Sequence, residues 1–206
     1  MLIWLLIIGG VVALDQATKA LLMVYIPNEY DCITVIPEVF QFKHYRNTGV
    51  AFGSFDGANQ RWMVIIVPAI GLIALLIYLW KFRPKSKLAC TALSMVIGGG
   101  IGNMIDRCVR LGDVYNSETK TTELRYYVFD FIDFCAFPKL WHFPFNVADI
   151  FVCVGAGMLM AWCIYSFVVE VKAEKAKKLE NEIFSQDSQD KADELPSKDE
   201  ESGGEK

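Results

Sequence analysis

The stretch Phe145-Asn-Val-Ala-Asp149-Ile-Phe-Val-Cys-Val-Gly-Ala-Gly-Met-Leu-Met-Ala-Trp-Cys-Ile-Tyr-Ser-Phe-Val-Val169 decides the fold. From Val147 to Val169 it has the length and apolar character of a helix that crosses a bilayer, which takes about 20 residues. Its one charged residue, Asp149, stands near the start. Ionisable groups at membrane depth are costly, so such a carboxylate points to a functional site. The stretch therefore predicts a transmembrane helix that begins at a polar site.

Three further apolar segments precede this one, at about Leu2–Ile26, Trp62–Trp80 and Leu88–Ile105. Of the 206 residues 53% are apolar, and the mean hydropathy is +0.31, which favours a membrane protein over a soluble domain. The first segment carries Asp15 in mid-run and no cleavage site follows it, so we expect a retained span and not a signal peptide. The chain is predicted to be a membrane all-α protein with four transmembrane helices.

Basic residues set the expected orientation. The loop 81–87 and the segment 172–178 that follows the last span each hold a cluster of them. The positive-inside rule places both in the cytoplasm, together with both termini, although sparser basic residues also occur in the second outer loop. Loops 27–61 and 106–146 are then outside, and the carboxylates of the spans gather at the outer face.

The outer loops carry strand patterns. Phe40–Tyr45 alternates apolar and polar residues, Tyr126–Phe134 does so in part, and Val50–Phe55 has the glycine of a turn and a returning segment. We therefore expect a small extracytoplasmic β-rich cradle on the helices. Residues 1–170 are predicted to form this domain, and the charged tail 171–206 to be cytoplasmic and disordered.

Paired carboxylates are the candidate chemistry. Two that lie close together share a proton, so one can act as a base on water while the other acts as an acid on a leaving amine. That pair can hydrolyse a peptide without a metal, and no histidine spacing here indicates a metal site or cofactor. Asp130 and Asp149 flank one outer loop and are the candidates, with Asp106 and Asp133 as rivals. The alternative is that these carboxylates form ion pairs with Arg107 or cap helices.

Two neighbouring polar residues, Arg107 and Asn146, have two interpretations each. Arg107 could hold an oxyanion or mark the lipid headgroups, and Asn146 could act in the site or cap a helix. Asn103 and Asp106 share a helix face, and Asp15 and Lys19 are spaced to pair within one helix. The run 98–102 is rich in glycine, which favours close helix contact in membranes.

Five motifs occur in a fixed order along residues 1–170: Asp15-Gln-Ala-Thr-Lys19, Asn47-Thr-Gly-Val-Ala-Phe52, Gly102-Asn-Met-Ile-Asp-Arg107, Val128-Phe-Asp-Phe131 and Phe145-Asn-Val-Ala-Asp149. Together they resemble the bacterial lipoprotein signal peptidase, or signal peptidase II, family. The resemblance implies an integral membrane aspartic endopeptidase of the bacterial cytoplasmic (inner) membrane, without cofactor or nucleic acid. It implies a monomer among membrane lipids that cuts diacylglyceryl-modified prolipoproteins before the lipidated Cys, at the outer face.

The resemblance also implies roles for single residues. Asp130 and Asp149 would be the catalytic pair, and Asp106 would pair with Arg107. The stretch Gly112–Tyr127 is longer than the family usually has and is expected to be an added hairpin or a longer lid, which leaves Asp133 as the fallback for Asp130. Positioning of the substrate and the transition state would come from Asn47, Asn103, Arg107 and Asn146. Support would come from Asp15, Lys19 and Asp106.

Two other functions use the same residues. A proton- or ion-coupled carrier would need polar residues down to the inner face, whereas Trp62–Trp80 has no charge. A non-catalytic lipoprotein-binding scaffold would keep the outer cap and lack turnover. Substitution of Asp130 by Asn separates the enzyme from this scaffold.

Overall fold

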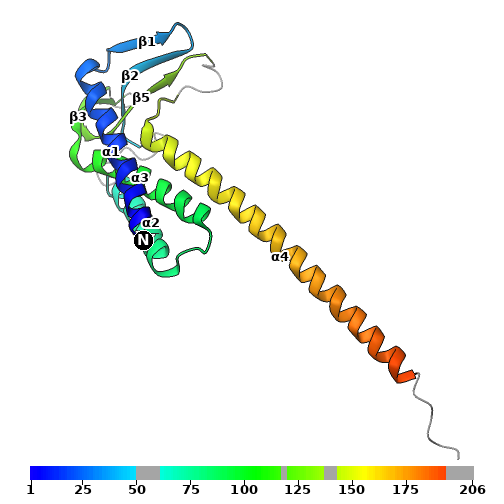
Figure 1. The fold of residues 1–206 in the computed structure, drawn as a ribbon. Helices are drawn as coiled ribbons and strands as arrows, with labels where there is room; N and C mark the ends of the chain where they lie inside the picture. Colours follow the sequence, from blue (N-terminus) through cyan, green and yellow to red (C-terminus); the bar gives the residue numbers. More distant parts are fainter. Residues whose placement is uncertain (50–60, 117–119, 137–142, 194–206) are drawn as a thin grey trace, which may run out of the picture. The chain divides into compact units, whose positions relative to one another are not determined.

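The computed structural model describes residues 1–49, 61–116, 120–136 and 143–193. Its helices are α1 (Leu2–Tyr25), α2 (Arg61–Ile77), α3 (Lys87–Val109) and α4 (Val147–Asp193), and α2 continues into a short π-helix, η1 (Tyr78–Phe82) (Figure 1). The helices hold four stretches long and apolar enough to cross a membrane, Leu2–Tyr25, Val64–Phe82, Lys87–Val109 and Val147–Glu182. All four predicted spans are therefore confirmed as helices of membrane-spanning length.

Glycines on α3 let its neighbours approach closely. A Cβ added at Gly98 would lie 2.8 Å from the Cβ of Val11 on α1, and one at Gly99 would lie 2.4 Å from the carbonyl oxygen of Ala148 on α4. Both distances are shorter than real Cβ contacts, so only glycine permits these backbone approaches. The glycine run predicted as a helix contact thus joins α3 to both α1 and α4.

Substitution of Gly99 by Ala is expected to lower the free energy of unfolding by about 1–3 kcal/mol, because the carbonyl of Ala148 is backbone and cannot rotate away. The measurement is thermal unfolding of the purified protein in detergent. Gly157→Ala on α4 is the matched control, because its added Cβ meets no atom of the described residues within 4 Å. Equal unfolding temperatures for the two variants would contradict the close contact.

Two small antiparallel sheets accompany the helices. One has the strand order β1 (Cys32–Ile36), β2 (Phe40–Asn47) and β5 (Val128–Phe134), and the other pairs β3 (Leu111–Asn116) with β4 (Thr121–Tyr126). The strands predicted within Phe40–Tyr45 and Tyr126–Phe134 are confirmed. The long stretch before Asp130 forms a hairpin in its described residues. The turn predicted at Val50–Phe55 lies outside the described residues.

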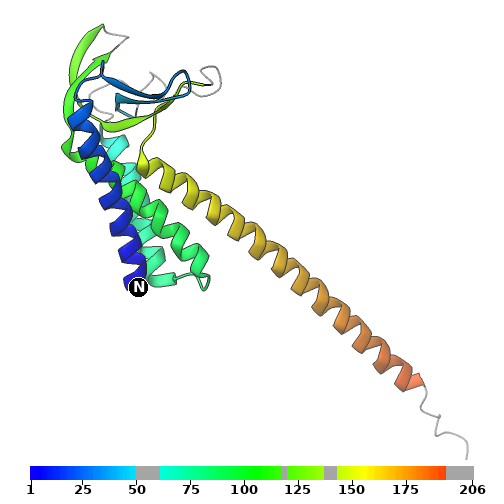
Figure 2. The same cartoon turned by 45° about the horizontal axis from the view of Figure 1, so that its top comes forward.

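The three-stranded sheet packs at the end of α1 through aromatic side chains. Phe129 and Phe131 of β5 bury against Ile26, and the ring of His44 lies 4.7 Å from that of Phe129. The His44 Nδ1 makes a 2.8 Å hydrogen bond with the Ile26 carbonyl. Figure 2 shows the sheet across the end of α1. Because side chains alternate along a strand, Asp130 points to the face opposite Phe129 and Phe131.

The chain divides into two compact units, Met1–Met160 and Ala161–Lys206. In the second unit α4 continues to Asp193, through residues for which the sequence predicted a disordered tail. The segment is rich in Ala, Glu and Lys, which are strong helix formers. A Glu174–Lys178 ion pair of 3.6 Å at i,i+4 spacing adds to them. Helical propensity therefore outweighs charge here as far as Asp193, and residues 194–206 lie outside the described part.

Candidate active site

Asp130 lies in the middle of β5 and is buried, with 1% of its surface exposed. The Asn146 Nδ2 donates to one carboxylate oxygen at 2.6 Å, and the Asn47 Nδ2 donates to the other at 2.8 Å. Burial raises the pKa of Asp130 to about 7, and the negative charge of Asp149 adds to the rise, while the two asparagines and Lys19 oppose it. Asp130 therefore keeps its proton up to near-neutral pH.

Asp149 lies in the first turn of α4 and is half-buried. Its backbone N–H donates to the Asn146 Oδ1 at 3.1 Å, and the Asn146 N–H donates to the Asp149 Oδ2 at 3.1 Å. This is a reciprocal capping box, so the N-cap interpretation of Asn146 is confirmed. The remaining oxygen, Oδ1, accepts a 2.8 Å hydrogen bond from the Asn103 Nδ2. Both oxygens of Asp149 thus accept hydrogen bonds at the N-terminus of a helix, where a negative charge is favourable.

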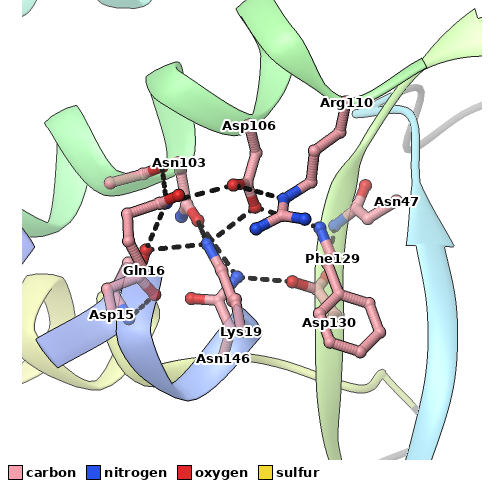
Figure 3. A network of polar contacts seen from close by, with 12 residues as sticks. Asp15, Gln16, Lys19, Asn47, Asn103, Asp106, Arg110, Phe129, Asp130 and Asn146 are labelled. Atoms are coloured by element: carbon pink, nitrogen blue, oxygen red, sulfur yellow. Dashed lines mark hydrogen bonds and ion pairs between the residues drawn. The ribbon is translucent and has the colours of Figure 1, made fainter. Parts of the chain in front are cut away.

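Asn146 is the residue that joins the two carboxylates. Its side-chain NH2 contacts Asp130, while its side-chain oxygen and backbone N–H hold Asp149. The same NH2 donates to the Asn103 Oδ1 at 3.0 Å, so α3 is tied to this point as well. Figure 3 shows Asn146 beside Asp130, with Asn47 on the other side of that carboxylate. The structure thus brings together Asn47, Asn103, Asp130, Asn146 and Asp149.

Arg107 lies against this group with an unused donor. Its buried Nε has no hydrogen-bond partner among the described residues, and the charges of Asp130 and Asp149 lie within electrostatic reach. Gly49 has a φ of 77° and approaches so closely that an added Cβ would lie 3.3 Å from the Arg107 Nη2. A buried, unpaired donor is costly, so this guanidinium is suited to an acceptor that arrives from outside the chain.

Asp106 does not pair with Arg107, contrary to the role that the resemblance implied. Its carboxylate lies 2.8 Å from the Lys19 Nζ and 2.8 Å from the Arg110 Nε. Residues four apart share a helix face, whereas consecutive residues point in different directions, so Arg110 and not Arg107 reaches Asp106. The predicted Asp15–Lys19 pair is confirmed at 2.9 Å.

Sequence reasoning missed two members of this group, Gln16 and Arg110. The Gln16 Nε2 donates to Asp106 at 3.1 Å and to the Gly102 carbonyl at 3.0 Å. The i,i+4 spacing of Asp106 and Arg110 was a signal for the second of them. No local spacing indicates Gln16, because two of its partners, Gly102 and Asp106, lie on another helix and the third, Asp15, is its neighbour in the chain.

Asp133, the fallback for Asp130, is not part of this group. It accepts a 2.8 Å hydrogen bond from the Gln41 Nε2, which lies opposite it on β2. Side chains alternate along β5, and an odd number of steps leads from Asp130 to Asp133, so the two point to opposite faces of the sheet. The geometry therefore favours Asp130 as the partner of Asp149.

Comparisons with known proteins agree with one another. Residues 7–165 match the family model Peptidase_A8, described as signal peptidase (SPase) II. The lipoprotein signal peptidase of Brevibacillus brevis is 38% identical over 156 residues, which cover 75% of this chain and 90% of that protein. That of Caldanaerobacter subterraneus is 39% identical over 155 residues, with 75% and 91% covered. A solved bacterial membrane enzyme has a TM-score of 0.65 at 27% identity, covering 79% of this chain and 93% of its own.

Proposed function

Because this chain belongs to the signal peptidase II family, we propose that it removes signal peptides from diacylglyceryl-modified prolipoproteins by cutting before the lipidated Cys. It is a multi-pass membrane hydrolase of the aspartic type. The observation that carries the assignment of the site is the joining of Asp130 and Asp149 by Asn146. Asp130 and Asp149 are the catalytic pair, and the positioning residues are Asn47, Asn103, Arg107 and Asn146.

The proposed orientation places the site at the outer face of the cytoplasmic membrane, with both termini inside. The basic loop 81–87 between α2 and α3 supports this under the positive-inside rule. The three-stranded sheet packs at the C-terminal end of α1. In this proposal it forms the extracytoplasmic cradle. Residues 1–170 form the peptidase domain in this proposal, and the helical tail extends into the cytoplasm.

In the proposed mechanism Asp149 is ionised and Asp130 is protonated at rest. Asp149 takes a proton from a water whose oxygen attacks the scissile carbonyl carbon, and Asp130 donates its proton to the carbonyl oxygen. The resulting diol carbon then expels the leaving amine, which takes the proton now held by Asp149, while a hydroxyl proton returns to Asp130. The unpaired Arg107 Nε is a donor for the developing charge on the substrate oxygen.

This assignment predicts that kcat/KM falls as the pH rises through the Asp130 pKa of about 7. This alkaline limb of the pH profile marks loss of the Asp130 proton. The Asn47 hydrogen bond favours the carboxylate form, so Asn47→Ala is expected to raise the Asp130 pKa and to move the alkaline limb upward by about one pH unit. Gln41→Ala, which removes the partner of Asp133, is the control and leaves the limb in place. A downward or absent shift in Asn47→Ala contradicts the assignment.

The function itself is tested with purified protein and one precursor in two forms, with and without diacylglycerol on its Cys. The expected result is a product that begins at the lipidated Cys, identified by mass, from the modified form only. A scaffold would bind the modified precursor without cutting it. Absence of cleavage by correctly folded protein would overturn the proposal.

A further inference from the structure

Two buried carboxylates hold the backbone directly before the proposed catalytic pair. The Asp15 Oδ1 on α1 accepts a 3.0 Å hydrogen bond from the N–H of Ala148, the residue that precedes Asp149. The Asp106 Oδ2 on α3 accepts a 3.2 Å hydrogen bond from the N–H of Phe129, the residue that precedes Asp130. Each catalytic residue is thus tied through its neighbour to a different carboxylate in the helices.

Lys19 connects these two carboxylates. Its Nζ lies 2.9 Å from the Asp15 Oδ2 and 2.8 Å from the Asp106 Oδ2, and all three side chains have 0% exposure. The third donor of the ammonium group goes to the Asn103 Oδ1 at 3.1 Å. Figure 3 shows the ammonium between Asp15, Asp106 and Asn103. All its donors are used, so the position of Lys19 fixes the distance between Asp15 and Asp106.

We propose that Lys19 is a positioning residue that sets the separation of Asp130 and Asp149. The chain of contacts runs from Phe129 N–H through Asp106, Lys19 and Asp15 to Ala148 N–H. This inference rests on the proposed function, because it assigns Lys19 a role in the reaction of that pair. Lys19 touches neither the substrate nor the reacting atoms in this account.

The surroundings of Lys19 are built to hold it in one place. Arg110 balances the second negative charge at 2.8 Å, and Gln16 bonds to both carboxylates at 3.1 Å. Gly102 provides the room for Asp15, because an added Cβ would lie 2.5 Å from its Oδ2. A buried ion pair is a poor source of stability compared with apolar packing, so its arrangement here fits a geometric role better than a stabilising one.

The test is the double variant Asp15→Asn/Lys19→Met. It removes one negative and one positive charge, and the side-chain oxygen of the introduced asparagine can still accept from the Ala148 N–H, so the bridge is lost together with the Lys19 contact to Asn103. The expected result is a kcat about 10²-fold lower at the variant's own optimal pH, since a shift of about 1 Å in reacting groups has this effect. KM is expected to stay within about twofold of the parent, and the thermal midpoint within a few degrees, as for a change in positioning alone.

Other roles give other results. If Lys19 acted only through its charge, the double variant would move the alkaline limb of the pH profile and leave kcat at the optimum unchanged. If Lys19 were only structural, the thermal midpoint would fall in step with the activity. Either result overturns the proposal. Ser94→Ala, which removes a buried hydroxyl bonded to the Cys90 carbonyl within α3, is the control and keeps the parental kcat. If the double variant does not fold, the single variant Asp15→Asn is tested in its place. A parental kcat in this single variant also overturns the proposal. A parent that does not cleave at all refutes the proposed function instead.

Discussion

Replacing Asp149 with Asn is expected to lower kcat for prolipoprotein cleavage by at least about 10³-fold, with little change in KM. The amide has nearly the shape of the carboxylate, and its oxygen can still accept from the Asn146 N–H, so the start of α4 is preserved. It cannot take a proton from water at any working pH. The measurement is single-turnover cleavage of the diacylglyceryl-modified precursor, which separates chemistry from product release.

The matched control for this prediction is Asp113→Asn, the same substitution at an exposed carboxylate of the hairpin. It is expected to keep the parental kcat and thermal midpoint. If the Asp149→Asn variant kept a tenth of the parental kcat, Asp149 would not be the base.

The second large effect is expected for Asn146→Ala, which removes the residue that joins the two carboxylates. We expect kcat to fall about 10²-fold, because Asp130 and Asn103 both lose a donor. Loss of the N-cap is expected to lower the free energy of unfolding by about 1 kcal/mol and the thermal midpoint by about 2–4 °C. Cleavage rates and thermal unfolding of the same preparations check both values.

Asn146→Ser separates the two roles of this residue. Serine is a good N-cap, so the thermal midpoint is expected to stay near that of the parent, whereas kcat falls as in Asn146→Ala because serine has no amide NH2. Parental activity in the serine variant would mean that Asn146 only caps α4.

The sequence predicts the spans well, because long apolar runs are a local signal. The start of α4 at Val147 agrees with the prediction, whereas α3 runs to Val109 and beyond the predicted end at Ile105. The prediction ended α3 where polar residues begin. In the structure Asp106 is buried against Lys19 and Phe129, so the helix continues through it.

The sequence predicts several residues of the candidate site, although not Gln16 or Arg110, and it does not predict their geometry. The motifs named Asp130 and Asp149, and the alternating pattern of Tyr126–Phe134 indicated a strand. Which face of that strand packs on α1 depends on Ile26 and His44, far away in the sequence, so the choice between Asp130 and Asp133 needed the structure. The residues before these two aspartates, Phe129 and Ala148, bond through their backbone N–H groups to Asp106 and Asp15 on the helices, and no side-chain pattern reveals such contacts.

The most direct test of the account compares Asp130→Asn with Asp133→Asn on the diacylglyceryl-modified precursor. Both substitutions lie on β5, so effects on the strand itself are matched. No detectable cleavage is expected from Asp130→Asn and a rate within about twofold of the parent from Asp133→Asn, since loss of a general acid costs about 10²–10⁴-fold. An active Asp130→Asn beside an inactive Asp133→Asn would contradict the account.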